Sequence, residues 1–194
     1  MTLNKRLFWS IILMLRRGGG RSTAEFIRKH HLYGSVGENC MIMKKKLPLY
    51  SNLVHLHNNV WVASNVGFVT HDVIHSMLNK NPLLGGGKFI EKVGCIEVMD
   101  NVFIGSGTRI LYNTRIGTNV IIGSDSLVTK DIPDNSVYAG VPARFICSFD
   151  EYVEKHKKYS EQFREKFGRD AVKGMDDALA AMMYEDFKKQ KAQK

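Results

Sequence analysis

A six-residue period in the hydrophobic residues constrains the fold more than any other feature. From Val98 to Val128 an aliphatic β-branched residue stands at every sixth position, and a second column of small or β-branched residues follows each by four positions. The same spacing recurs upstream, from Leu56 to Phe68. A period of six fits neither an isolated α-helix, with a period of about 3.6, nor an ordinary strand, with a period of about 2. The chain is therefore predicted to turn a corner every six residues.

Three such sides close a triangular coil of about eighteen residues, and successive coils stack through parallel strand pairing. The β-branched column points into the prism, and small residues fill its corners. Glycine follows the first column at Gly105, Gly117 and Gly123, where it permits turn conformations. Evenly spaced strands of a β-sandwich would not repeat in two columns over six consecutive sides. The sequence therefore predicts a mainly β fold, a parallel β-helix.

The repeat breaks directly after His71. Residues 76–92 lack the period and contain a proline and three consecutive glycines, so we expect a loop that leaves one corner of the solenoid. Long loops in compact domains are usually functional. A solenoid also needs caps on its end coils. The predicted organisation is an N-terminal helical segment at 1–35, the β-helix at 36–147 and C-terminal helices at 148–194.

The sequence also suggests where the terminal helices begin and end. Ser22 to Glu25 form a capping-box pattern that predicts a helix to about His30, and Ser148 to Glu151 form another that predicts a helix ended by Gly168. A further amphipathic helix is expected at residues 175–189. Its methionine and aromatic stripe is interpreted as core packing.

An apolar segment near the N-terminus allows two interpretations. Residues 7–15 (LFWSIILML) are flanked by Lys5-Arg6 and Arg16-Arg17. The segment is about half as long as a membrane-spanning helix, and no small-residue cleavage site of the A-x-A kind follows it. We expect a helix packed on the protein. Weak contact with a membrane surface or a membrane-bound partner is the alternative.

Composition and charge limit the classes of ligand and partner that the chain is expected to bind. The net charge is +9, which suits a polyanion, but no nucleic-acid-binding motif is present, and a small polyphosphate is the better partner. Three widely spaced cysteines without a CxxC argue against a disulfide framework and a structural zinc site. No metal is expected, and a reducing cytoplasm fits.

Three segments carry a resemblance to a known family. These are residues 59–72, residues 100–106 and the ending VTKDIPDNSVYAGVPARFI (128–146). Together they resemble the hexapeptide-repeat acetyltransferases. Within that family they look most like galactoside and maltose acetyltransferases and O-acetyltransferases of polysaccharide gene clusters. The resemblance covers residues 22–160. It implies a left-handed β-helix and a homotrimer that binds acetyl-CoA in a groove between neighbouring prisms. The chain departs from the family where Phe103 replaces a common tryptophan, and where two further helices follow the solenoid.

The resemblance also implies roles for individual residues. His71 matches the catalytic histidine, and Ser106 matches a serine that steadies the tetrahedral intermediate. The residues implied to contact the coenzyme are Ser106, Ser124, Thr129, Lys130 and Arg144, of which Ser124 lines the pantetheine path and the last three lie near the adenine and phosphates.

The residue types suit acyl transfer to a hydroxyl. Imidazole, with an ordinary pKa of about 6.5, is well matched to accept the proton of an attacking hydroxyl near neutral pH. Charge that develops on the thioester oxygen needs a donor already in place, and Ser106 is the candidate. We expect direct transfer in a ternary complex. Asp72, a backbone carbonyl or a group from the neighbouring subunit would orient His71, and His75 is a candidate substrate contact.

The expected function is acetyl-CoA-dependent O-acetylation of a sugar hydroxyl on a polysaccharide or glycoside precursor. Acetylation of an amino sugar, a drug or serine is the nearest alternative. A zinc enzyme like the γ-type carbonic anhydrases would need three converging histidines. A non-catalytic trimeric scaffold that binds membrane enzymes through residues 7–15 is the remaining alternative.

Overall fold

The computed structural model describes residues 3–43, 46–168 and 174–192. The chain divides into two compact units, Met1–Phe149 and Asp150–Lys194. All the strands among the described residues belong to the first unit.

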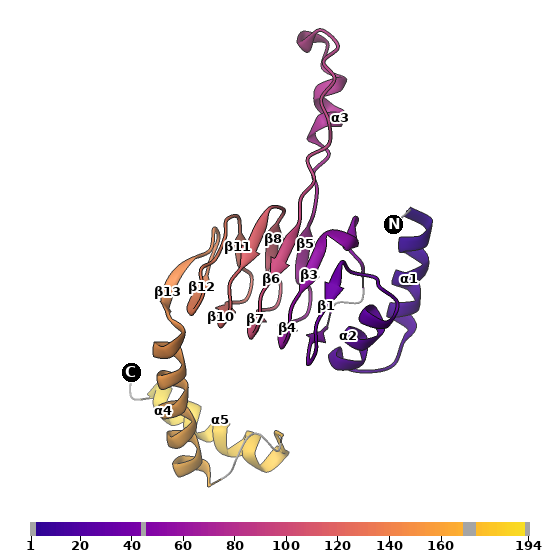
Figure 1. Cartoon of the computed structure of the whole chain (residues 1–194). Coiled ribbons are helices and arrows are strands. Elements are labelled where there is room, and N and C mark those ends of the chain that lie inside the picture. Colours follow the sequence, from indigo (N-terminus) through magenta and orange to yellow (C-terminus); the bar gives the residue numbers. More distant parts are fainter. Residues whose placement is uncertain (1–2, 44–45, 169–173, 193–194) are drawn as a thin grey trace. The chain divides into compact units, whose positions relative to one another are not determined.

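Three sheets, named A, B and C here, run along the first unit (Figure 1). Sheet A contains β1 (Ser35–Val36), β3 (Val54–Leu56), β6 (Ile96–Val98) and β9 (Thr114–Ile116). Sheet B contains β2 (Met41–Ile42), β4 (Val60–Val62), β7 (Val102–Ile104), β10 (Val120–Ile122), β12 (Ser136–Ala139) and β13 (Arg144–Ser148). Sheet C contains β5 (Gly67–Val69), β8 (Arg109–Leu111) and β11 (Leu127–Val128). From β3 to β11 the chain visits A, B and C in turn, so the sheets are the sides of a triangular prism.

The strand register sets the length of each coil. Val102 pairs with Val120 and Ile110 with Val128, both eighteen residues apart and in parallel. Among the strands that the structure describes, only β13 runs antiparallel, as the outer arm of a hairpin with β12. The predicted left-handed parallel β-helix, with its loop and terminal helices, is confirmed.

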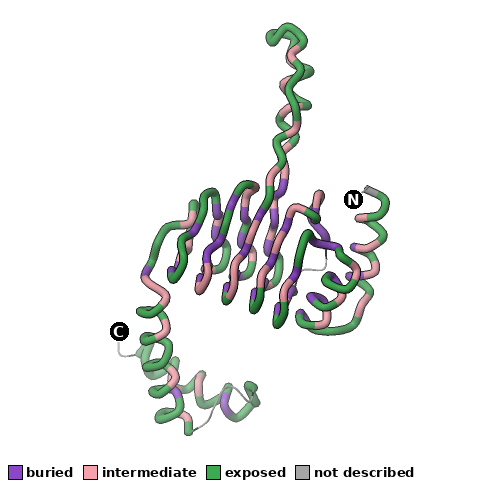
Figure 2. The backbone as a smooth tube through the Cα atoms, in the orientation of Figure 1, coloured by how far each residue is buried: buried purple, intermediate pink, exposed green. Residues whose placement is uncertain are grey.

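The two columns of the six-residue period form the interior of the prism. None of their residues is more than 3% exposed, and Figure 2 shows buried positions recurring from coil to coil. The columns are Val98, Ile104, Ile110, Ile116, Ile122 and Val128, and Val102, Thr108, Thr114, Val120, Ser126 and Ile132. The buried hydroxyls of Thr108 and Ser126 both donate to the carbonyl of Gly123, at 3.1 and 2.7 Å.

An asparagine ladder runs along the corner between sheets A and B. Its four residues have left-handed backbones, with φ between 55° and 59°: Asn59, Asn101, Asn119 and Asn135. Each side-chain amide donates to the next carboxamide oxygen, at 3.0, 3.1 and 2.9 Å in order. Asparagine tolerates this backbone conformation better than most residues do. The ladder therefore serves both the turn and the stacking of coils. The corners were expected to hold small residues and glycine, and the ladder was not predicted.

The loop leaves the solenoid between β5 and β6. Strand partners on its two sides, such as Val54 and Ile96, are 42 residues apart instead of eighteen, so the loop adds 24 residues to one coil. It contains α3 (Ile74–Asn79) and the 3₁₀ helix η2 (Pro82–Leu84), neither of which buries a residue. Its arms pair at the base, where the Asp72 N–H donates to the Lys92 carbonyl at 3.0 Å. The loop stands away from the coil stack (Figure 1).

Two helices cap the first coil. In α1 (Leu3–Leu15) Leu13 is buried, and in α2 (Gly20–Lys29) Ile27 is buried, with α2 packed on β1 and β2. No helix among the described residues is long and apolar enough to cross a bilayer.

The predicted start of α2 is wrong. The helix begins at Gly20, its N-cap is Gly19, and Ser22 instead accepts a hydrogen bond from Arg16 at 3.1 Å. A Cβ on Gly20 would lie 2.5 Å from Cγ of Met41, so close packing on the first coil sets where the helix begins.

The second unit consists of a helix pair. Helix α4 (Phe149–Phe167) begins where predicted and is followed by Gly168 with φ 60°, and α5 (Asp177–Ala192) follows. The expected core stripe of α5 is only partly buried. Leu179 is 1% exposed, but Met182 and Phe187 are 44% and 52% exposed, because a pair of helices covers only one side of each member.

Asn119 tests the ladder. Asn119→Ala should lower the free energy of unfolding by about 3–4 kcal/mol, because an alanine in the left-handed region costs about 1–2 kcal/mol and each of the two lost ladder hydrogen bonds costs about 1 kcal/mol. Asn119→Gly keeps the conformation and should lose only about 2 kcal/mol, from the two hydrogen bonds. Denaturant titration of both variants measures the difference. Equal losses would mean that the backbone conformation contributes nothing.

Candidate active site

His71 lies at the corner between sheets C and A, at the base of the loop. It follows β5 and forms an isolated antiparallel bridge with Val93 on the returning arm. The Gly94 N–H donates to the Thr70 carbonyl at 3.0 Å, so backbone bonds hold both arms around His71. The histidine is thus on a fixed part of the solenoid, although the rest of the loop stands away from it.

Tyr50 packs against the ring of His71. The two rings meet edge to face, with centroids 5.3 Å apart and planes at 82°. The Tyr50 hydroxyl donates to Oε2 of Glu91 at 2.8 Å, and this bond is the main cause that raises the pKa of Tyr50. Tyr50 was not predicted. It lies outside the repeat, on an irregular stretch before β3, and no pattern in the sequence marks it.

One ring nitrogen of His71 lacks a hydrogen-bond partner among the described residues. Its Nδ1 is buried without a hydrogen-bond partner among the described residues, and the same holds for Nδ1 of His75 on α3. Nε2 of His75 lies 3.2 Å from the hydroxyl of Ser76. A buried imidazole nitrogen ordinarily finds a partner. Any group that orients His71 through Nδ1 therefore has to come from outside the described residues.

The side chain of Asp72 hydrogen-bonds to Tyr112 and not to His71. Its carboxylate accepts the Tyr112 hydroxyl at 2.8 Å and the Ile74 N–H at 3.1 Å. The hydrogen bond from Tyr112 is the main cause that lowers the pKa of Asp72 below its ordinary value. These bonds tie the first turn of α3 to β8 and its corner. Asp72 thus fixes the base of the loop. Because neighbouring residues on an extended chain point to opposite sides, Asp72 is not expected beside the ring of His71.

Ser106 and Ser124 lie at another corner, between sheets B and C. They follow β7 and β10 in consecutive coils, and both are exposed. The Asp125 N–H donates to the Ser106 carbonyl at 2.7 Å, which stacks the two turns on each other. The two serines therefore form a short row along one edge of the prism, one side of the prism away from His71.

The three basic and hydroxyl candidates lie further along the solenoid. Thr129 and Lys130 follow β11 and are exposed at the corner between sheets C and A. Arg144 begins β13, is exposed, and donates to the Ala143 carbonyl at 3.1 Å. Within one chain, the structure thus brings Ser106 and Ser124 together, but separates them from His71.

A cleft of about 860 Å³ opens beside the serine corner. Arg6 and Met14 of α1 line one side, and Lys46, Ser64, Arg109 and Asp125 contribute to the rest. Nη1 of Arg109 donates to the carbonyls of Asn65 and Gly107, both at 2.8 Å. This cleft was not predicted, because its walls come from distant segments of the chain.

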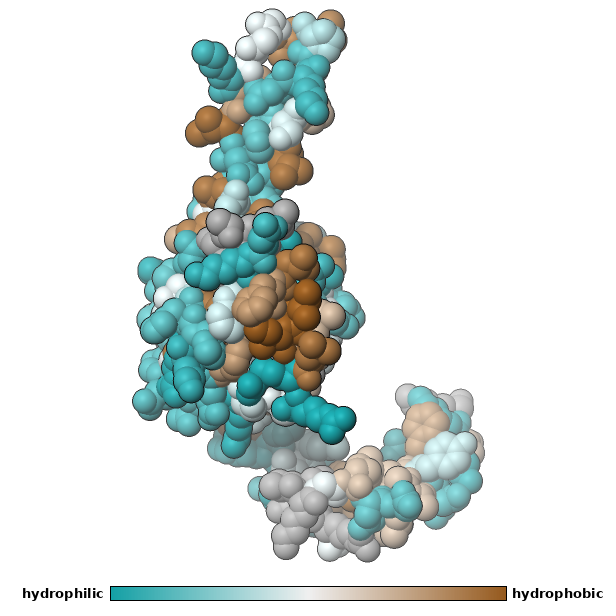
Figure 3. Space-filling view, turned by 90° about the vertical axis from the view of Figure 1, so that its right-hand side faces the viewer, coloured by the Kyte–Doolittle hydropathy of each residue, from teal (hydrophilic) through white to brown (hydrophobic). Residues whose placement is uncertain are grey.

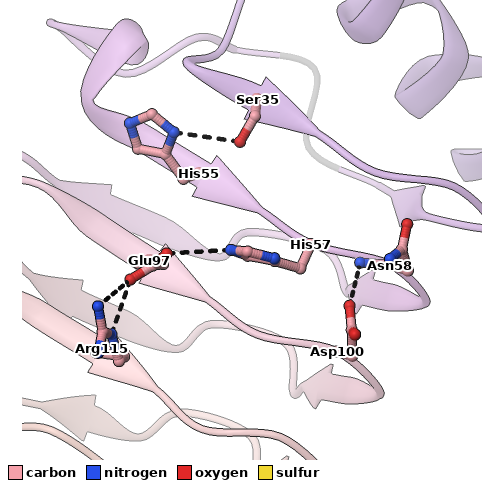
Figure 4. A network of polar contacts seen from close by, with 7 residues as sticks. All are labelled: Ser35, His55, His57, Asn58, Glu97, Asp100 and Arg115. Carbon is pink, nitrogen blue, oxygen red and sulfur yellow. Dashed lines mark hydrogen bonds and ion pairs between the residues drawn. The ribbon is translucent and has the colours of Figure 1, made fainter.

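A polar network crosses the outer face of sheet A (Figure 4). Oε1 of Glu97 lies 3.1 Å from Nε2 of His57, and Oε2 accepts from Arg115 at 2.8 Å. The pKa of Glu97 is lowered, mainly by the hydrogen bond with His57 and then by Arg115. The network links side chains of three consecutive coils and serves their stacking. Among the described residues, no three His, Cys, Asp or Glu side chains gather as a metal site would require.

Comparisons with known proteins agree with this architecture. The family described as "Bacterial transferase hexapeptide (six repeats)" matches residues 96–130. Protein CapG of Staphylococcus aureus is 35% identical over 124 residues, which are 62% of this chain and 69% of CapG. The chain belongs to the hexapeptide-repeat acetyltransferase family.

Two further members of this acetyltransferase family are close in sequence or structure. Galactoside O-acetyltransferase of Lactococcus lactis subsp. lactis (strain IL1403) is 32% identical over 139 residues, 61% of this chain and 63% of that protein. A solved galactoside acetyltransferase in complex with coenzyme A matches with a TM-score of 0.55 and 26% identity, over 78% of this chain and 84% of the other. The chain spans 50–63% of the length of the first curated relatives that it matches.

Tyr112 provides a test of the loop base. In Tyr112→Phe the pKa of Asp72 should rise toward its ordinary value, measured by carboxyl NMR titration. Because the folded pKa is lowered, the bond stabilises the protein above the ordinary aspartate pKa, and this stability is lost as pH falls through the lowered value. The difference in melting temperature between the two proteins should therefore shrink as pH falls. Tyr159→Phe, on α4, is the control, and an unchanged Asp72 titration would contradict the assignment.

Proposed function

We propose that the chain is an acetyl-CoA-dependent O-acetyltransferase that acts on a sugar hydroxyl. The observation that carries the proposal is His71, held at the base of the loop on a coil stack that matches a coenzyme A complex over 78% of this chain. The names of the relatives, galactoside and maltose O-acetyltransferases, support a sugar acceptor. Amino sugars, drugs and serine are the other acceptors to test.

His71 acts as the general base in this proposal. Its neutral ring takes the proton of the acceptor hydroxyl as the oxygen attacks the thioester carbonyl. The tetrahedral intermediate then collapses, the carbon–sulfur bond breaks, and the coenzyme thiolate receives the proton from the imidazolium. Ser106 donates to the oxygen that carries the developing charge. The products are the acetyl ester and free coenzyme A, with no covalent enzyme intermediate.

The coenzyme follows the edge and the end of the prism in this proposal. Ser106 and Ser124 stand in consecutive turns of one corner, which suits an extended pantetheine chain. Lys130 and Arg144 are exposed cations that suit its phosphates, and Thr129 lies beside Lys130. The free cysteines Cys40, Cys95 and Cys147 fit the reducing cytoplasm where we expect the reaction.

Two chains are needed to complete this site. His71 and Ser106 lie at different corners of one prism, so a thioester held by Ser106 is presented to the histidine of a neighbouring chain. The loop supports the same arrangement, because eight of its large apolar side chains are exposed: Val73, Ile74, Met77, Leu83, Leu84, Phe89, Ile90 and Val93. An exposed apolar surface of this kind marks an interaction site. A homotrimer with three shared sites satisfies both observations.

Replacement of the base is the first test. His71→Ala should release free thiol from acetyl-CoA, in the presence of a panel of sugars and nucleotide sugars, at least about 10²-fold more slowly than the parent. His156→Ala, on α4, should match the parent. If the parent releases no thiol and acetyl-CoA does not raise its melting temperature, the scaffold alternative replaces the enzyme.

Mixed trimers test the shared site. His71→Ala and Ser106→Trp should each be nearly inactive, because one lacks the base and the other fills the coenzyme path. Co-expression of the two variants should restore activity, since about a quarter of random interfaces join an intact histidine to an intact serine. A mixture as inactive as its parts would mean that both residues serve one chain.

A further inference from the structure

Helix α1 packs on the protein with one side and leaves a broad apolar side exposed. Leu13 and Ser10 are 2% and 6% exposed against the first unit. The opposite side carries five large apolar residues, all between 46% and 78% exposed: Leu7, Phe8, Ile11, Met14 and Leu15. At 100° per residue these five fall within an arc of about 120°. They are called the α1 face below. A contiguous apolar surface of this kind marks an interaction site, so the α1 face lacks its partner.

The α1 face is continuous and lies at the end of the coil stack. In Figure 3 hydrophobic surface gathers on the end of the first unit that α1 forms, between hydrophilic regions. In Figure 1 α1 is the outermost element at this end of the stack. A broad surface can therefore reach the α1 face without meeting another part of the solenoid.

The charge around α1 selects the partner. Five basic residues precede Glu25, the first acidic residue of the chain: Lys5, Arg6, Arg16, Arg17 and Arg21. Lys5 and Arg17 are exposed at the two ends of the helix. Arg16 and Arg21 also lie over aromatic rings, at 4.3 Å from Phe26 and 5.7 Å from Trp61. An apolar stripe bordered by cations matches a bilayer with anionic head groups.

We propose that α1 docks the protein on the surface of an anionic lipid bilayer. The 13-residue helix is too short to span the hydrocarbon core and lies parallel to the surface, with the α1 face among the acyl chains and Lys5 and Arg17 at the head groups. A two-fold contact between copies of the chain would instead bring Lys5 and Arg17 of one copy close to the same two cations of the other, so that like charges would repel.

Docking has a consequence for the cleft at the serine corner. Arg6 and Met14 belong to α1 and also line that cleft, together with Lys46 and Arg109. A bilayer that covers the α1 face therefore lies beside the cleft opening and its three cations. The docking proposal itself does not depend on the proposed acetyl transfer, because its test measures lipid binding alone.

Vesicle sedimentation tests the proposal with the full chain. We expect binding to vesicles in which phosphatidylglycerol replaces about a third of the phosphatidylcholine, and at least tenfold weaker binding to phosphatidylcholine alone. The double variant Phe8→Asp, Ile11→Asp should bind the anionic vesicles at least tenfold more weakly. The control, Met182→Asp with Phe187→Asp on α5, removes apolar side chains that are similarly exposed and should bind like the parent.

Two further variants keep the test decisive. Leu15→Asp changes the most exposed residue of the α1 face, at 78%, and leaves the packed side of the helix intact if the double variant fails to fold. Lys5→Glu with Arg17→Glu should lose the preference for anionic lipid. The proposal is overturned if the parent does not bind anionic vesicles or if the α5 control weakens binding as much as the α1 variants. It is also overturned if the α1 variants lower the particle mass in light scattering and leave vesicle binding unchanged, since the α1 face would then join copies of the chain.

Discussion

Each coil of this protein depends on the pairing of its short strands with those of the next coil, which lie eighteen residues further along the chain in the regular part of the repeat. A strand of two or three residues satisfies few backbone groups by itself, so a single coil has no stability of its own. Strict parallel stacking gives every interior position the same surroundings in each coil. That position therefore accepts only side chains of similar width, which is why β-branched and small residues repeat in two columns and remain at most 3% exposed. The asparagine ladder applies the same rule to a corner, where one residue type serves four successive turns.

This repetition explains what could be predicted from the sequence. Interior residues such as Ile104 and Val120 repeat because their environments repeat, so the period alone predicts the coil, its core and the corner where the loop leaves. The ends of the stack have no repeated environment. The start of α2 is set by the close approach of Gly20 to Met41, and the exposure of Met182 by a helix pair that covers only one side of α5. Neither fact leaves a periodic signal.

The candidate site also has some residues that could be predicted from the sequence and others that could not. The position of His71 before the break in the repeat, together with the family resemblance, made it a candidate from the sequence, and its role stays a prediction. Tyr50 and the cleft beside the serine corner were not predicted, since each arises from segments that meet only after folding. Separation of His71 from Ser106 by one side of the prism is a property of three-dimensional register. A single sequence does not state which copy of the chain supplies each residue.

The loop shows how such a solenoid can change without being rebuilt. Val54 pairs with Ile96 and Phe68 with Ile110 in the same register as strands that no loop separates, so the excursion leaves the stack unaltered. Its base is closed by backbone bonds and by Asp72 with Tyr112, none of which depends on the residues beyond them. The corner between sheets C and A is thus a site where the solenoid tolerates an inserted segment. Segments of different length and composition can be exchanged there, while the coils retain one unchanged set of interior contacts.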